Sequence, residues 1–169
     1  MAISQSQFHR MVTDHGPALY RMAYRMVGDR HEAEDIVQEA FRSAWKSRNG
    51  YQRGRSERAW LAAILRRRTV DHWRKKKSRA VVLASDSTLD MATPGEDPLV
   101  NDYTDEMQKA LCPLTPEVRE SLLLVVVAEL THQEAADVLG VPLGTVLSRV
   151  SRARRRLRTA LLAEAKMTR

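Results

Sequence analysis

Residues 140–158 read GVPLGTVLSRVSRARRRLR, and they hold six arginines and no acidic residue. Gly140 and Pro142 are typical of a turn that ends one helix and starts the next. After Pro142, apolar residues recur at steps of three and four, at Val146, Val150, Ala153, Leu157 and Leu161. This stripe predicts a helix that packs on its own domain, which leaves the arginines on its other faces for an anionic partner.

The segment before this stretch completes a helix-turn-helix pattern. Thr131 and Glu134 have the three-residue spacing of a capping box, so we expect a short helix from there to Gly140. A cap residue and a proline predict another helix over 115–130. A short helix, a glycine-containing turn and a longer basic helix together indicate a DNA-binding module.

The first turns of the basic helix are the part that would reach bases in a DNA major groove. Arginine pairs with guanine through two hydrogen bonds, serine bonds to several bases, and leucine can contact the thymine methyl group. Further arginines would meet phosphates, which gives affinity without sequence preference. The residues predicted to read DNA are Leu147, Ser148, Arg149, Ser151, Arg152 and Arg155.

The first half of the chain is also expected to be helical. A helix over 18–27 should stop at Gly28, and Asp29 with Glu32 has the spacing of a second capping box. The helix that follows carries an apolar stripe, at Ile36, Val37, Ala40, Phe41, Ala44 and Trp45. We expect this stripe to face the core of the domain.

A third helix is expected to start near Ser56, after a loop over 46–56. Its predicted core face consists of Trp60, Ala63, Ile64, Val70 and Trp73. Arg67 falls within that face, where an arginine needs an anionic partner or a path to solvent.

Charge is distributed in blocks along the chain. Residues 29–39 hold five acids, 53–79 hold eleven lysines and arginines, and 86–106 hold seven acids and no base. Two prolines and a glycine interrupt the last block, which is typical of a linker.

We therefore predict an all-α chain of two small helical domains. The first domain covers 1–80, the second covers 112–169, and an acidic flexible linker over 81–111 joins them.

Composition narrows the functional classes. The formal net charge of +7 fits an anionic partner, and the lone Cys112 allows neither an internal disulfide nor a cysteine-rich zinc site. The longest apolar run, 122–128, is far shorter than the roughly 20 residues that span a bilayer. We expect a cytoplasmic protein without stable membrane insertion, metal or cofactor, and no histidine has the spacing of a catalytic constellation.

Three segments carry a family resemblance. HEAEDIVQEAFRSAW (31–45), RAWLAAILRRRTVDHWRKK (58–76) and LTHQEAADVLGVPLGTVLSRVSRAR (130–154) resemble, in this order, regions 2.2, 2.3–2.4 and 4.2 of bacterial sigma factors. The family is group 4 of the sigma-70 proteins, the extracytoplasmic function (ECF) sigma factors. The resemblance implies a non-catalytic subunit that brings core RNA polymerase to promoters and helps open the −10 region.

The resemblance also assigns tasks to particular residues. The −35 element would be read by the residues of the basic helix named above, and this domain would also contact the β flap of the polymerase. The β′ clamp of core polymerase would bind one face of the second helix, at Glu34, Asp35, Gln38, Glu39 and Arg42. The −10 element would be met by the loop and the third helix, at Tyr51, Gln52, Arg53, Arg66, Arg67, Arg74 and Lys75. Many members are held by an anti-sigma factor, so we expect such a partner.

Two residues depart from the family pattern. Position 147 is commonly lysine or arginine in the family and is Leu147 here, and position 67 is commonly asparagine and is Arg67 here. Both positions touch promoter readout in the family, so the promoter sequences of its members do not transfer to this chain.

Two other classes fit parts of the pattern. An ordinary helix-turn-helix regulator would bind DNA without polymerase, usually as a dimer. An RNA-binding or membrane-surface protein would use the basic blocks, and its binding would follow salt but ignore promoter sequence.

Overall fold

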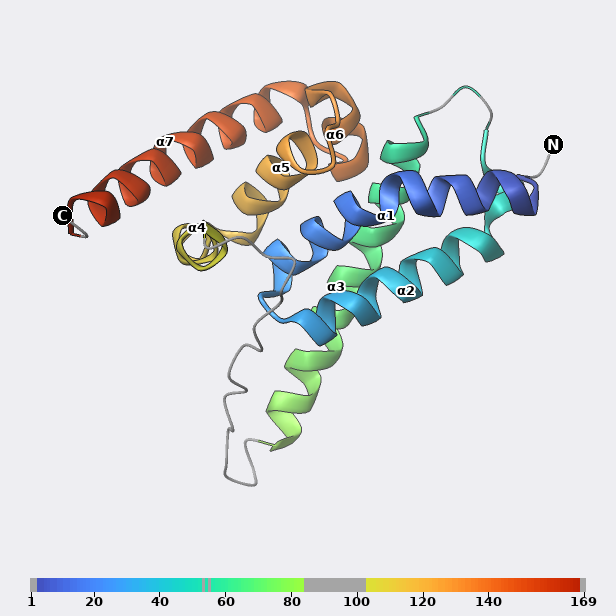
Figure 1. Cartoon of the computed structure of the whole chain (residues 1–169), viewed down its shortest axis with the longest axis horizontal. Coiled ribbons are helices and arrows are strands. Elements are labelled where there is room, and N and C mark those ends of the chain that lie inside the picture. The colour runs from blue at the N-terminus through green and yellow to red at the C-terminus, as the bar shows by residue number, and fades with distance from the viewer. Residues whose placement is uncertain (1–2, 53, 55, 84–102, 168–169) are drawn as a thin grey trace.

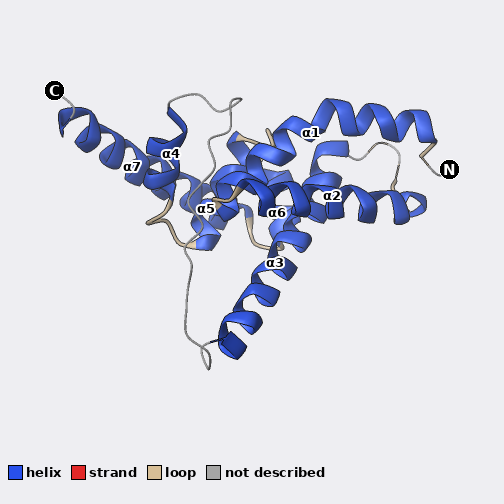
Figure 2. Ribbon diagram, turned by 60° about the horizontal axis from the view of Figure 1, so that its bottom comes forward, coloured by secondary structure: helices blue, strands red, loops and turns tan. Residues whose placement is uncertain are grey.

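The computed structural model describes residues 3–52, 54, 56–83 and 103–167, and these residues form helices with short connections. The helices are α1 (Gln5–Val27), α2 (Arg30–Lys46), the 3-10 turn η1 (Arg48–Gly50), α3 (Glu57–Leu83), α4 (Tyr103–Leu111), α5 (Pro116–Val126), α6 (His132–Leu139) and α7 (Leu143–Met167). Figure 1 shows their arrangement, and Figure 2 shows that no strand occurs in the described part. The prediction of an all-α chain is confirmed.

Helix α1 begins well before the expected residue 18. Ser4 caps it, because the Ser4 hydroxyl accepts from the Gln7 amide at 3.2 Å and the Gln7 side chain accepts from the Ser4 amide at 3.0 Å. Two orphan amides at the helix start are thereby satisfied. The helix even includes Pro17, a residue that argues against a long helix when only the sequence is read.

The turn between α1 and α2 follows the prediction at Gly28. This residue has a left-handed φ of 75°, and its amide donates to the Tyr24 carbonyl at 2.7 Å. Asp29 then caps α2 by accepting from the Glu32 amide at 2.8 Å. The prediction that the Glu32 side chain would complete the capping box at Asp29 is wrong. The Glu32 carboxylate pairs with His72 and Lys76 of α3 instead.

The core face of α3 differs from the predicted one. The buried residues are Leu61, Ala62, Ile64, Leu65 and Thr69. Of the predicted face only Ile64 is among them, and Trp60 and Trp73 are half-buried against the edge of the core. Arg67 therefore lies on the solvent side rather than in a gap of the core face, and the conflict expected there does not arise.

Helix α7 packs against α4, α5 and α6, and its predicted core line is confirmed at Val146, Val150 and Ala153. Leu157 and Leu161 farther along are half-buried. Helix α5 ends at Val126, earlier than expected, because the chain reverses at Glu129, which has a φ of 55°.

Most of the expected linker, residues 84–102, lies outside the described residues. Within the rest of that segment, α3 continues to Leu83 and α4 packs on α7. Helix α4 thus belongs structurally with the second half of the chain.

The two halves are packed together. Helix α5 lies on α1 and α6 lies on α3 (Figures 1 and 2). One apolar core runs through both halves. Arg119 of α5 donates to the Met26 carbonyl of α1 at 3.4 Å, and Arg58 of α3 pairs with Glu129. The last turns of α3 and of α7 extend beyond this packed centre.

Candidate nucleic-acid interface

The turn that sets the direction of α7 is built by two caps. Thr131 and Glu134 form the predicted capping box, with the Thr131 amide donating to the Glu134 carboxylate at 2.8 Å and the Glu134 amide donating to the Thr131 hydroxyl at 3.1 Å. These hydrogen bonds hold the pKa of Glu134 below its usual value. Gly140 ends α6 with a φ of 66°, as expected for a left-handed cap.

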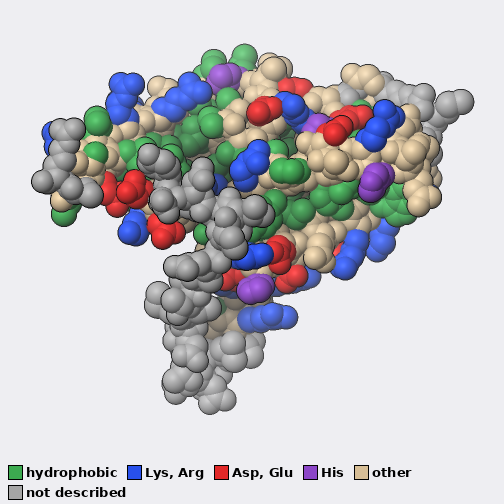
Figure 3. Space-filling view, in the orientation of Figure 1, with side chains coloured by type: hydrophobic (Ala, Val, Ile, Leu, Met, Phe, Trp, Pro, Cys, Tyr) green, Lys and Arg blue, Asp and Glu red, His purple; other side chains and the backbone are tan. Residues whose placement is uncertain are grey.

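Helix α7 presents one continuous exposed face opposite its buried line. Most residues predicted to read the −35 element lie on it: Leu147, Ser148, Ser151, Arg152 and Arg155 are all exposed. Leu147 leaves 47% of its surface open, although it is apolar. In Figure 3, Lys and Arg side chains are spaced along this helix. The face can offer hydrogen-bond donors, hydroxyls and an apolar contact to a groove of DNA.

Arg149 is the exception in this set, because it is half-buried. Its charge acts on Glu120 of α5, a carboxylate that is only 7% exposed. Arg66 of α3 is the direct partner of this carboxylate, with 2.7 Å between Arg66 Nε and Glu120 Oε1. Burial raises the pKa of Glu120, although both arginines act to lower it.

The predicted −10 residues of α3 therefore divide into two groups. Arg67, Arg74 and Lys75 are exposed, and Arg67 Nε donates to the Ala63 carbonyl at 3.3 Å. Arg66 is instead turned toward Glu120. Near the free end of α3, Arg74, Lys77, Ser78 and Val81 line a shallow hollow of about 540 Å³.

The loop before α3 holds its aromatic residue in place. The rings of Tyr51 and Trp60 lie 5.0 Å apart between centroids, and burial together with Glu57 raises the pKa of Tyr51. Gln52 is exposed, and Arg53 lies outside the described residues. A hollow of about 270 Å³ beside the loop is lined by Ile3, Gln7, Met11, Tyr51, Gly54 and Glu57.

The predicted clamp-binding face of α2 is open to solvent. Asp35, Gln38, Glu39 and Arg42 are exposed. Glu34 is half-buried and pairs with Arg30 at 3.1 Å, while Arg42 and Glu39 lie 3.6 Å apart. Exposed pairs of this kind contribute little to stability, so the face remains available to a partner.

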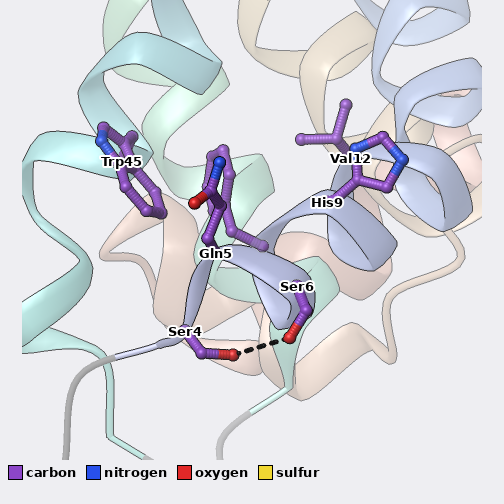
Figure 4. Close-up of a pocket in the computed structure, with 7 residues that line it drawn as sticks. Ser4, Gln5, Ser6, His9, Val12 and Trp45 are labelled. Carbon is purple, nitrogen blue, oxygen red and sulfur yellow. Dashed lines mark hydrogen bonds between the residues drawn. The ribbon is translucent and has the colours of Figure 1, made fainter.

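A third hollow lies at the far end of α2, where it meets the start of α1. It has a volume of about 960 Å³ and is lined by Ser4, Gln5, Ser6, Phe8, His9, Val12 and Trp45 (Figure 4). Phe8 packs on Trp45 with 5.1 Å between ring centroids. Among the residues that the structure describes, no three His, Cys, Asp or Glu side chains gather as metal ligands.

Sequence reasoning missed the acidic residues that join the two halves. Glu120 lies in a helix whose buried residues are mostly apolar, and an acid two residues before the apolar run 122–128 was the available signal. Glu129 directly follows the apolar run 122–128 and offered the same kind of signal. In the part of the chain that the structure describes, no helix is long and apolar enough to cross a bilayer.

Taken together, the fold and the exposed faces define a helix-turn-helix DNA-binding protein with a second basic helix, α3, in the other half of the chain. Comparison with protein families gives two matches in this order: Sigma-70 region 2 matches residues 11–79, and Sigma-70, region 4 matches residues 104–157.

Curated relatives extend over most of the chain. The chain is 31% identical to the ECF RNA polymerase sigma factor SigW of Bacillus subtilis, covering 93% of this chain and 90% of that protein. It is 37% identical to SigE of Mycolicibacterium smegmatis, covering 89% of this chain and 60% of that longer protein. Among solved structures, the sigma factor RpoE in complex with the anti-sigma factor NepR from Bartonella quintana is similar with a TM-score of 0.78. That likeness has 30% identity and covers 91% of this chain and 96% of that chain.

The chain belongs to the ECF sigma factors of the sigma-70 family. It is thus a subunit without catalytic activity of its own that directs RNA polymerase to promoters.

Proposed function

We propose that this sigma factor binds core polymerase through α2 and reads a promoter with two separate surfaces. Helix α7 reads the −35 element, and the loop before α3 together with the basic face of α3 binds the −10 element. The exposed face of α7 is the main support for this proposal. Ser148, Ser151 and Arg152 lie opposite the buried residues that pack the helix on its own domain. Such an arrangement leaves donors free for bases while the helix stays anchored.

Opening of the −10 region requires a place for a base that leaves the stack. The hollow beside Tyr51 supports this role for the loop, since it lies next to the exposed Gln52 and at the start of the basic α3. Arginines and lysines farther along α3 supply phosphate contacts that hold the separated strand. No bond is made or broken by this chain, and the work is binding and positioning.

The exposed face of α2 supplies the polymerase contact in this proposal. Its acidic residues, Asp35 and Glu39, fit a basic or polar helix of the β′ clamp, and the second domain additionally contacts the β flap. Since core polymerase works in the bacterial cytoplasm, the proposal places this chain there.

An anti-sigma factor is also part of the proposal. Two similar solved structures are complexes of this kind: RpoE with the anti-sigma factor NepR, and CnrH with the cytosolic domain of CnrY. The second has a TM-score of 0.70 and 27% identity, and covers 95% of this chain and 90% of that chain.

The test is a DNA-binding experiment with and without core polymerase. Fragments of a bacterial genome are mixed with the chain alone, with core alone, or with both, and the retained fragments are sequenced. We expect a defined set of fragments sharing two spaced motifs only when both proteins are present. Retention of the same set by the chain alone would identify an independent regulator, and retention without a shared motif would identify non-specific binding.

A further inference from the structure

Two exposed leucines lie at the start of α7 and form an apolar ridge. Leu143 leaves 39% of its surface open, and Leu147 leaves 47% open. Residues four positions apart are neighbours on one face of a helix, so the two side chains form one continuous apolar surface, which we call the leucine ridge. A single exposed leucine is ordinary, but this pair lies on the turns with which such a helix meets base edges.

The fold does not use the leucine ridge. Val146 and Val150 are buried and anchor this end of α7 on its own domain. Among the residues that the structure describes, neither Leu143 nor Leu147 belongs to the apolar core or to the side chains packed against it. Truncation of either leucine should therefore leave the domain folded, and the ridge is free to contact a partner.

Gly144 keeps the surface beside the leucine ridge low. A Cβ atom added at this glycine would meet nothing within 4 Å, and its backbone is not left-handed. The fold itself therefore does not require a glycine at this position. Glycine lets a ligand come close to the backbone, so DNA can approach the first turn of α7 without a side chain at 144 in the way.

Ser148 follows Leu147 and can meet DNA in only one way. Its hydroxyl donates to the Thr145 carbonyl at 3.0 Å, so while this bond is kept the oxygen offers only acceptor positions to a base. In the major groove, adenine offers an amino group as a donor, and the thymine paired with it offers a methyl group. One A·T pair thus presents together the two features that Leu147 and Ser148 can contact.

We propose that Leu143 and Leu147 select thymine in the −35 element by packing against its C5 methyl group. This inference rests on the proposed role of α7 in reading that element, and it adds Leu143 to the residues that determine specificity. Cytosine and the purines lack this methyl group. Removing one such group from water against leucine corresponds to about threefold in affinity. The arginines of α7 contribute most of the attraction to DNA, and the leucine ridge contributes a choice of base.

The first experiment compares thymine with deoxyuridine, which lacks only the methyl group. Fragments that core polymerase and the full chain retain together are synthesised with single thymine-to-deoxyuridine changes in the upstream motif, and the Kd of the holoenzyme is measured for each. We expect about threefold weaker binding for at least one of these changes. Leu143→Ala or Leu147→Ala should abolish this difference. Leu162→Ala is the matched control, because Leu162 is a 57% exposed leucine farther along α7, and it should keep the wild-type difference.

Three results would overturn the proposal. The first is equal affinity for thymine and deoxyuridine throughout the upstream motif. The second is a difference that persists in both leucine variants. The third is weaker co-purification of the leucine variants with core polymerase while the difference between thymine and deoxyuridine is unchanged, because this would assign the leucine ridge to a protein contact.

The second experiment tests the close approach of DNA at Gly144. Gly144→Leu places a side chain in open space, so the helical circular dichroism should stay unchanged, while binding of the holoenzyme to the same fragments should weaken several-fold. Ala163→Leu is the matched control, because it places a leucine at another exposed position of α7, and it should bind like the wild type. Equal affinities of the two variants would contradict the close approach.

Failure of the proposed function and failure of this inference give different results. If the holoenzyme retains no defined set of fragments, the proposed function is refuted, and the selection of thymine is refuted with it. If the holoenzyme retains a defined set but binds thymine and deoxyuridine equally, only the role of the leucine ridge is refuted.

Discussion

Thr131 shows how one side chain sets the geometry of the DNA-binding module. Its hydroxyl and amide exchange hydrogen bonds with Glu134 and fix the start of α6, which in turn supports α7. Thr131→Ala should lower the free energy of unfolding by about 1 kcal/mol in urea denaturation, because an N-cap is lost. Thr13→Ala is the control, since Thr13 only bonds back to the His9 carbonyl within α1. Equal effects of the two substitutions would contradict the assignment.

The pH dependence of stability separates Glu134 from Glu120. The folded pKa of Glu134 is below its ordinary value of 4.5, so its contribution is present above that value and is lost as pH falls through the folded pKa. The folded pKa of Glu120 is raised, so as pH falls Glu120 is protonated in the folded state before it is protonated in the unfolded chain. The contribution of Glu120 to stability therefore falls as pH rises above 4.5.

Urea denaturation from about pH 3 to 6 measures how the contributions of Glu134 and Glu120 to stability change with pH. The stability difference between wild type and Glu134→Gln should increase with pH, and the difference between wild type and Glu120→Gln should decrease. Two differences that change in the same direction would show that one of the two environments is wrongly described.

Single residues with strong local chemistry could be predicted from the sequence. Gly28, Asp29 and the Thr131–Glu134 pair act within one turn of helix, and the structure shows them as expected. Glu32 could not be assigned correctly, because its partners His72 and Lys76 lie about 40 residues away in the chain. A long-range pair of this kind leaves no periodic trace in the sequence.

Helix α7 contains two kinds of arginine, and they should respond differently to substitution. Arg152→Ala removes a proposed base contact, so it should weaken −35-dependent binding of the holoenzyme by about 1–3 kcal/mol and relax the preference at one base. Arg154→Ala removes a proposed phosphate contact and should mainly reduce the salt slope, by about one unit. Binding titrations on promoter variants at several salt concentrations measure both. A uniform loss across all promoter variants for Arg152→Ala would refute base readout.

Helix α2 should no longer bind core polymerase when the charge of its exposed face is reversed. Asp35→Lys with Glu39→Lys should abolish co-purification with core polymerase while the helical circular dichroism stays unchanged, because both side chains are exposed. Asp14→Lys with Glu106→Lys makes the same charge change at exposed acids on α1 and α4, and it should leave co-purification intact. If both double variants failed to co-purify with core polymerase, the cause would be the change in net charge rather than the face of α2.

The elements themselves were predictable where caps and apolar stripes agree, as in α2, α6 and α7. Two errors have physical causes. The core face of α3 was predicted from its large aromatic residues, Trp60 and Trp73. These side chains pack at the edge of the core, and Leu61 and Leu65 fill its centre. Helix α1 is longer than expected because Ser4 and Gln7 form a cap that was not recognised.

At the scale of the whole molecule, the sequence indicated two helical halves but not their contact. The packing of α5 on α1 and of α6 on α3 depends on surfaces that are far apart in the chain, and neither half signals it alone. Glu120 and Arg66 belong to different halves, so their pairing became visible only in three dimensions.

Transcription in a purified system tests the central claim most directly. Core RNA polymerase, the full chain and fragments selected by their joint binding are mixed with nucleotides, and the 5′ ends of the RNA are mapped. We predict RNA that begins at defined positions, a fixed distance downstream of two spaced motifs, and only when the chain is present. Transcripts without defined starts, or the same starts with core polymerase alone, would contradict the account.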